Sequence, residues 1–129
     1  MKKIDSSFFD SSAWLAYCFE AAKRTKDLIE SESVIYTSAL SLFEVKKKLA
    51  VIGTDTQKIN EVCGMIQSRS IIIPIDWEIA EGAVDYALQN KLGAIDALIY
   101  ASARSVRSIL ITADLDFNGM PETEIIRQN

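Results

Sequence analysis

The sequence predicts an α/β domain in which a parallel β-sheet is covered by helices on both faces. Short apolar or β-branched runs alternate with longer helical patterns along the chain, which is typical of repeated β-α units. Residues 71–75 and 109–112 are almost continuous Ile and Leu runs, as expected for strands buried on both sides. The length of 129 residues is typical of one domain, so residues 1–129 are predicted to form a single unit.

The individual elements follow from local patterns. The predicted strands share short apolar or β-branched runs, and they cover residues 7–9, 34–37, 71–75, 109–112 and, as a short fifth strand, 124–126. The predicted helices share helical spacing or helix-favouring composition, and they cover residues 12–19, 20–30, 40–52, about 55–69, 79–89 and 94–105. We expect Gly53 to close the helix over 40–52, and either Thr54 or Asp55 to cap the next helix.

The residue types that are missing restrict the chemistry. The sequence has no histidine, which excludes Ser-His-Asp and Cys-His nucleophiles, His-bound zinc and imidazole bases. Cys18 and Cys63 match no zinc-binding spacing and are expected to be reduced thiols buried in the core. Any catalysis must therefore use carboxylates, hydroxyls, Lys, Tyr or a bound metal ion.

Charge and hydropathy limit the partners and the compartment. The net charge of −4 does not favour nucleic-acid binding by overall electrostatics. Apolar runs are only a few residues long, so no membrane-spanning helix is predicted. Asp5 and Asp10 interrupt the apolar N-terminal stretch, so we expect a cytoplasmic protein without a cleaved signal peptide.

Four acidic residues occupy positions where such a fold places function. Asp10 directly follows the first predicted strand and Asp114 follows the fourth. Both should therefore lie at the carboxyl edge of the sheet, where ligand sites collect. Asp96 lies in the first turn of an otherwise apolar helix, and Glu44 lies inside a helix among apolar neighbours.

Each of these carboxylates also has an ordinary structural interpretation. Asp10 would cap the helix that follows it, and Asp114 would be a turn residue. Asp96 would stabilise a helix N-terminus, and Glu44 would form an i,i+4 pair with Lys48.

As a set, the four carboxylates favour a metal site. The segment around Asp96 is expected to be buried on most sides, where an unpaired carboxylate is costly. Several carboxylates at one place repel each other unless a divalent cation is bound. Oxygen ligands without His or Cys indicate Mg²⁺ or Mn²⁺. Such an ion lowers the pKa of a bound water, which can then attack a phosphodiester.

The ordered set of motifs resembles the PIN-domain ribonucleases over essentially the whole chain. The matching segments are Asp10-Ser11-Ser12 after a strand, Glu44 in a helix, residues 93–99 around Asp96, and residues 110–117 with Asp114 and Asp116. The resemblance implies a three-layer α/β/α sandwich with strand order 3-2-1-4-5. It also implies a Mg²⁺ or Mn²⁺ ion held by Asp10, Glu44, Asp96 and Asp114.

The same resemblance implies supporting roles for further residues. Asp116 would be an outer or second-metal carboxylate. Ser12 and Thr112 match positions of small hydroxyls that orient ligands or water, and Asp96 would help to activate the attacking water as well as bind metal.

Many single-domain members of this size resemble the toxins of VapBC-type toxin–antitoxin pairs. This implies an RNA endonuclease, commonly a homodimer, whose active-site groove is blocked by the C-terminal segment of a small antitoxin protein. A role in RNA processing and a catalytically weak or inactive interaction module of the same fold are the alternatives. A receiver-like domain is disfavoured because no Lys follows Arg107.

Local positive charge offers a route to RNA despite the net charge. Three consecutive basic residues lie about one turn beyond Glu44: Lys46, Lys47 and Lys48. They are expected either to contact a phosphate backbone or to form a solvated helix face. Phe43 lies on the same helix, and base stacking by an aromatic residue is an alternative to a core role. For Trp14 and Tyr17, a core or oligomer-interface position is favoured.

Overall fold

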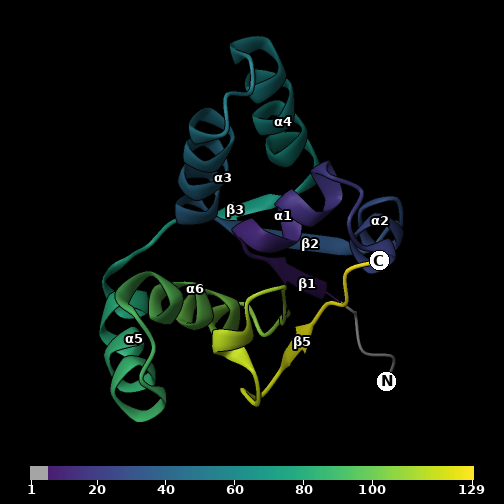
Figure 1. Cartoon of the computed structure of the whole chain (residues 1–129). Helices are drawn as coiled ribbons and strands as arrows, with labels where there is room; N and C mark the ends of the chain where they lie inside the picture. The colour runs from purple at the N-terminus through teal and green to yellow at the C-terminus, as the bar shows by residue number, and fades with distance from the viewer. Residues whose placement is uncertain (1–5) are drawn as a thin grey trace.

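A five-stranded parallel sheet forms the centre of the molecule (Figure 1). The computed structural model describes residues 6–129. The strands are β1 (Ser6–Phe9), β2 (Val34–Ser38), β3 (Ile71–Ile73), β4 (Ile109–Thr112) and β5 (Thr123–Ile125). All neighbouring strands are parallel, and their order is β3-β2-β1-β4-β5. The predicted sheet and its strand order are confirmed.

Helices connect the strands in sequence. They are α1 (Ser11–Cys18), α2 (Lys23–Ile29), α3 (Ala39–Val51), α4 (Thr56–Arg69), α5 (Trp77–Asn90) and α6 (Ala94–Ser105), with a 3₁₀ turn, η1 (Leu115–Phe117), after β4. Within residues 6–129, no helix has the length and hydrophobicity needed to cross a bilayer.

Several element boundaries differ from the sequence prediction by one to three residues. The strand predicted over residues 71–75 ends at Ile73, because Pro74 has no N–H to donate to the sheet. The helix predicted over residues 20–30 begins only at Lys23, since Glu20 adopts a positive φ of 54° in the turn after α1. The turn η1 was not predicted.

Two hydrophobic clusters lie on opposite faces of the sheet. Phe9 packs with α1, α3 and α4 residues on one face, whereas its neighbour Phe8 packs with α5 and α6 residues on the other. Successive strand residues point to opposite faces, so β1 supplies both cores. Figure 1 shows α5 and α6 on one side of the sheet and α1 to α4 on the other, which confirms the predicted three-layer sandwich.

Trp14 fixes α1 to the sheet beside the first strand end. Its side chain is fully buried, and the indole Nε1–H donates to Thr37 Oγ1 at 2.9 Å. Thr37 in turn donates to the carbonyl of Phe9 at 2.7 Å. The expected core position of Trp14 is confirmed, and it holds the start of α1 in place directly after Asp10.

The caps around α3 and α4 agree with the predicted turn chemistry. Gly53 follows the last residues of α3 with φ of +86°, and its N–H donates to the carbonyl of Ala50. The N–H of Thr54 donates to the carbonyl of Leu49, which completes a Schellman motif. Of the two predicted caps for α4, Asp55 is correct, because its side chain accepts the N–H of Lys58.

The two thiols are less buried than predicted. Cys18 and Cys63 are both free and half-buried at the edge of the core beside α1 and α4. The prediction of fully buried thiols was therefore wrong, because both residues lie on helix faces that are only partly covered.

Candidate active site

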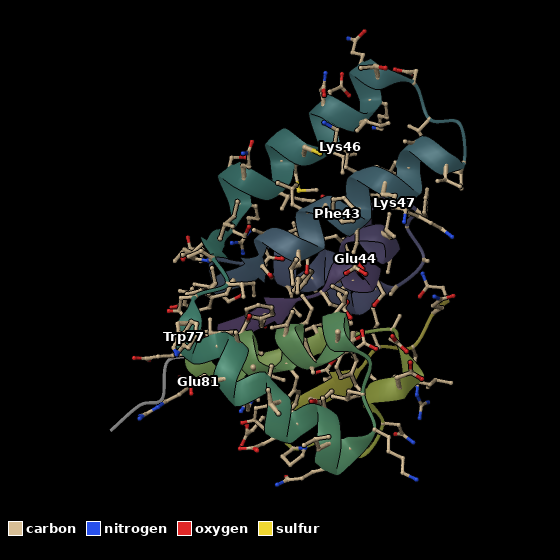
Figure 2. The ribbon with its side chains drawn as sticks, turned by 90° about the vertical axis from the view of Figure 1, so that its left-hand side faces the viewer. Phe43, Glu44, Lys46, Lys47, Trp77 and Glu81 are labelled. Carbon is tan, nitrogen blue, oxygen red and sulfur yellow. The ribbon has the colours of Figure 1, made fainter. Side chains whose placement is uncertain are left out.

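The predicted acidic residues lie together at the carboxyl edge of the sheet. β1 and β4 are parallel neighbours, and Phe9 is aligned with Ile111. Asp10 follows β1 directly, and Asp114 lies just beyond β4. The first turn of α6 brings Asp96 to the same edge, and α3 brings Glu44. In Figure 2, Glu44 lies on the side of α3 nearest the helices of the opposite layer.

Asp10 is buried and fully hydrogen-bonded. Its Oδ1 accepts the backbone N–H of Ala13 at 2.9 Å and the hydroxyl of Ser12 at 2.7 Å, and its Oδ2 accepts the hydroxyl of Thr112. The predicted role as cap of α1 is therefore correct. Burial raises the pKa of Asp10 to about 6, although the donors from Ser12, Thr112 and Ala13 lower it. The nearby charge of Asp114 raises it further.

Ser12 and Thr112 connect Asp10 to the end of β4. The two hydroxyl oxygens lie 3.2 Å apart. Ser12 Oγ accepts the N–H of Ala113 at 2.8 Å, and Thr112 Oγ1 accepts the N–H of Asp114 at 3.0 Å. These two hydroxyls therefore set the geometry of both strand-end carboxylates.

Replacing Thr112 by Val is expected to lower the free energy of unfolding by about 2 kcal/mol, because Asp10 loses a buried donor and the N–H of Asp114 loses its acceptor. Urea denaturation followed by circular dichroism measures the change. Thr112→Ser keeps the hydroxyl and is expected to lose about half as much. A Thr112→Val protein as stable as wild type would show that the hydroxyl does not support Asp10 and Asp114.

Asp96, Asp114 and Asp116 form the tightest acidic group. Each contributes one carboxylate oxygen, and the three oxygens lie within 4.8 Å of one another. Asp114 also caps η1, since its Oδ1 accepts the N–H of Asp116 at 2.9 Å. A carboxylate oxygen of Asp116, which was expected as an outer carboxylate, thus lies within 4.8 Å of an oxygen of Asp96 and of Asp114.

Asp96 experiences the charge of the whole site. Its pKa is raised to about 6, first by burial and then by the charges of other carboxylates, which are Asp114, Asp116, Glu44 and Asp10 in decreasing order. Asp96 is only half-buried, and the preceding Ile95 is 41% exposed. The prediction that this segment is buried on most sides was wrong, because the first turn of α6 reaches the surface.

Glu44 completes the set from a different layer. Burial raises the pKa of this half-buried carboxyl, the hydroxyl of Ser11 lowers it, and the charge of Asp114 raises it. Among residues 6–129, Glu44 forms no ion pair with Lys48, so that alternative interpretation is not supported. Ser11 was not predicted as a site residue, although its position between Asp10 and Ser12 was a signal for it.

The donor set fits a hard divalent cation. The ion pairs of the described chain join Lys23 to Asp27, Arg24 to Glu124 and Lys26 to Glu30, so none involves a site carboxylate. The site offers oxygen ligands only. Burial raises the pKa values of Asp10 and Asp96, and the charges of neighbouring carboxylates raise them further. Mg²⁺ and Mn²⁺ prefer such ligands.

Comparison with known proteins identifies the same architecture elsewhere. The family model described as PIN domain matches residues 7–122. No curated protein sequence matches the chain.

Solved structures with the same fold come from several bacteria. A toxin-antitoxin complex from Klebsiella pneumoniae is 26% identical, with a TM-score of 0.72 over 92% of this chain and 95% of that one. VapBC2 from Rickettsia felis, bound to a promoter DNA fragment, is 16% identical with a TM-score of 0.75 over 96% and 99%. VapC20 from Mycobacterium tuberculosis, described as a Sarcin-Ricin loop cleaving toxin, is 18% identical with a TM-score of 0.73 over 93% and 98%.

The family match covers nearly the whole described chain, from β1 to the segment before β5. It includes all five acidic residues at the carboxyl edge of the sheet. The chain belongs to the PIN domain family.

Proposed function

We propose that this protein is a cytoplasmic Mg²⁺- or Mn²⁺-dependent endoribonuclease and the toxin of a VapBC-type toxin–antitoxin pair. The observation that carries the proposal is the convergence of five carboxylates at the carboxyl edge of the sheet, none of which forms an ion pair within residues 6–129. The printed descriptions of the similar structures, which are toxin–antitoxin complexes and an RNA-loop-cleaving toxin, support it.

The proposed roles of the site residues differ. The carboxylates that would hold the ion are Asp10, Glu44, Asp96 and Asp114, with Asp116 alongside. When bound, Mg²⁺ or Mn²⁺ neutralises phosphate charge and lowers the pKa of the attacking water. Asp96 would hold the ion and would also be the group that accepts a proton from the attacking water. Ser12 and Thr112 donate to Asp10 and keep its two oxygens oriented.

RNA is the proposed substrate. The exposed side chains of Lys46, Lys47 and Lys48 would contact its phosphate backbone. Lys47 and Lys48 line a cavity that is also lined by Glu44, whereas Lys46 is not among its lining residues.

A small antitoxin and a second copy of the chain are the proposed protein partners. Trp77, Val84 and Leu88 lie on one face of α5 at helical spacing and are all more than half exposed, with Trp77 at 78%. Figure 2 shows Trp77 and Glu81 close together on α5. An exposed apolar stripe of this kind is typical of a protein interface, and we assign it to the homodimer.

A catalytically weak PIN-fold interaction or RNA-processing module is the second candidate. It has the same fold but does not require five converging carboxylates. Clustered carboxylates repel each other and lower the stability of the fold. The presence of this cluster therefore favours an enzyme over an inactive module.

Metal removal is the first test of the nuclease. We expect cleavage of single-stranded RNA in Mg²⁺ or Mn²⁺, loss of cleavage in EDTA, and recovery when excess metal is returned, because the carboxylates alone supply no Lewis acid. Gel analysis of end-labelled RNA measures each rate. Cleavage that survives EDTA would exclude this site as its source.

The toxin role is tested separately by genomic and growth observations. We expect a short reading frame for a small partner protein next to this one, and growth arrest on expression of this chain that co-expression of the partner relieves. A lone transcript without growth arrest would favour RNA processing.

A further inference from the structure

A cavity opens directly beside the carboxylates. It has a volume of about 420 Å³ and lies where α1, α3 and the first turn of α6 meet. Its lining includes Glu44 and Ser11 from the candidate active site, and Ile95, the neighbour of Asp96. The volume falls within the range of about 300–1,000 Å³ that is typical of small-molecule sites.

The walls of the cavity combine an apolar face with a basic rim. Phe43 and Ile95 supply apolar surface, and both are unusually exposed, at 64% and 41%. Lys47 and Lys48 supply positive charge on the same helix as Phe43. Phe43 and Lys47 are four residues apart on α3, so their side chains lie on one face of the helix, as Figure 2 shows.

We propose that this cavity binds the nucleobase adjacent to the scissile phosphate. The ring of Phe43 stacks on the base, and Lys47 and Lys48 contact the next phosphate along the chain. The proposal rests on the proposed ribonuclease function and extends it by assigning a base-recognition subsite. A single nucleotide carries a flat apolar ring and phosphates on either side of its sugar, and the lining of this cavity combines the ring of Phe43 and the carboxylate of Glu44 with two lysines.

The charge pattern supports a nucleotide as the occupant of the cavity. The lysines attract phosphate, and the carboxylate cluster requires a cation that phosphate also binds. The apolar stripe of α5, assigned above to a second copy, is not part of the cavity lining.

Phe43→Ala is expected to raise KM about 10-fold with little change in kcat, because stacking contributes to binding rather than to bond cleavage. The Mn²⁺ concentration that gives half-maximal activity should not change, since the carboxylates are intact. Phe19→Ala is the matched control, because Phe19 is an exposed aromatic residue outside the cavity.

A double comparison tests the contact itself. The probe is a pool of single-stranded oligoribonucleotides that contains every dinucleotide step, from which the step cleaved by the wild-type protein is mapped. An abasic nucleotide is then placed on each side of that bond. If Phe43 stacks on one of these bases, removing that base should lower kcat/KM about 10-fold for the wild-type protein. For Phe43→Ala, removing the same base should lower kcat/KM almost no further. If the abasic nucleotide and the Phe43→Ala substitution lower kcat/KM by factors that simply multiply, the base and the ring do not interact and the proposal is wrong.

Two further measurements distinguish an error in the proposed subsite from an error in the proposed nuclease function. Sedimentation velocity compares wild type and Phe43→Ala; if the substitution dissociates a dimer, the surface is a protein interface and the proposal is wrong. Fluorescence anisotropy in Ca²⁺ compares binding of intact oligonucleotides with a series carrying one abasic nucleotide at each position. Absence of any cleavage by wild type contradicts the proposed function, whereas equal binding of intact and abasic RNA contradicts the subsite.

Discussion

Asp96→Asn is expected to reduce RNA cleavage by about 100-fold or more and, at the same time, to raise the thermal midpoint of the metal-free protein. The amide has the shape of the carboxylate but neither its charge nor its proton affinity. Cleavage falls because the oxygen that would hold the cation and accept a proton is lost. Stability rises because Asp96 lies within 4.8 Å of both Asp114 and Asp116, whose charges repel it.

The expected gain in stability is modest. Asp96 is half exposed, so solvent screens much of the repulsion, and we expect about 1 kcal/mol at neutral pH. Thermal unfolding in EDTA measures it, and initial cleavage rates in Mn²⁺ measure the loss of activity. Asp85→Asn on the exposed face of α5 is the matched control and should change neither quantity. A metal-free Asp96→Asn protein that is less stable than wild type would give Asp96 a structural role instead.

Most of the fold could be predicted from local patterns. The Ile and Leu runs before Pro74 and before Ala113 identified β3 and β4. The expected burial on both sides holds for β4, but it was wrong for β3, which is an edge strand whose Ile71 is 53% exposed. The exact end of α6 at Ser105 was also predicted. The turn between α1 and α2 was missed, since the positive φ of Glu20 has no Gly or Asn to indicate it.

The sequence predicted that the site carboxylates would lie at one edge of the sheet, but not how closely they approach each other or that Ser11 contacts Glu44. Asp10 and Asp114 were placed correctly because a parallel sheet brings adjacent strand ends together. The closeness of Asp116 depends on η1, a short turn held by the N–H bond to Asp114 that sequence periodicity does not reveal. The cavity beside Glu44 depends on how three helices pack, which no local pattern specifies.

The structural and functional interpretations of the acidic residues are compatible with each other. Asp10 caps α1, as its ordinary interpretation predicted, and Asp114, predicted as a turn residue, caps the turn η1. Those caps fix the carboxylates in position before any ion arrives, so little ordering entropy remains to be lost on binding. The same hydrogen bonds that stabilise the turns therefore help to preorganise the candidate metal site.

The stability of the metal-free protein is expected to fall as the pH rises from about 4 to about 7, by about 2 kcal/mol. Burial raises the pKa of Asp10 from 3.8 to about 6, so the folded protein binds this proton more tightly than the unfolded chain does. The contribution is complete below about pH 4 and is lost as the pH passes through about 6. Asp96 adds to it in the same direction, by less because it is half exposed.

Divalent cations should reverse this trend, because they bind the ionised carboxylates and compete with protons for them. Urea denaturation at a series of pH values, in EDTA and in excess Mn²⁺, measures both profiles. The stabilisation by Mn²⁺ is expected to grow from about pH 5 to about pH 7, and Asp96→Asn should reduce it. Asp85→Asn should leave both profiles unchanged. A metal-free profile that rises with pH over this range would mean that Asp10 is stabilised in its ionised form, and the argument for a cation at this site would then lose its electrostatic basis.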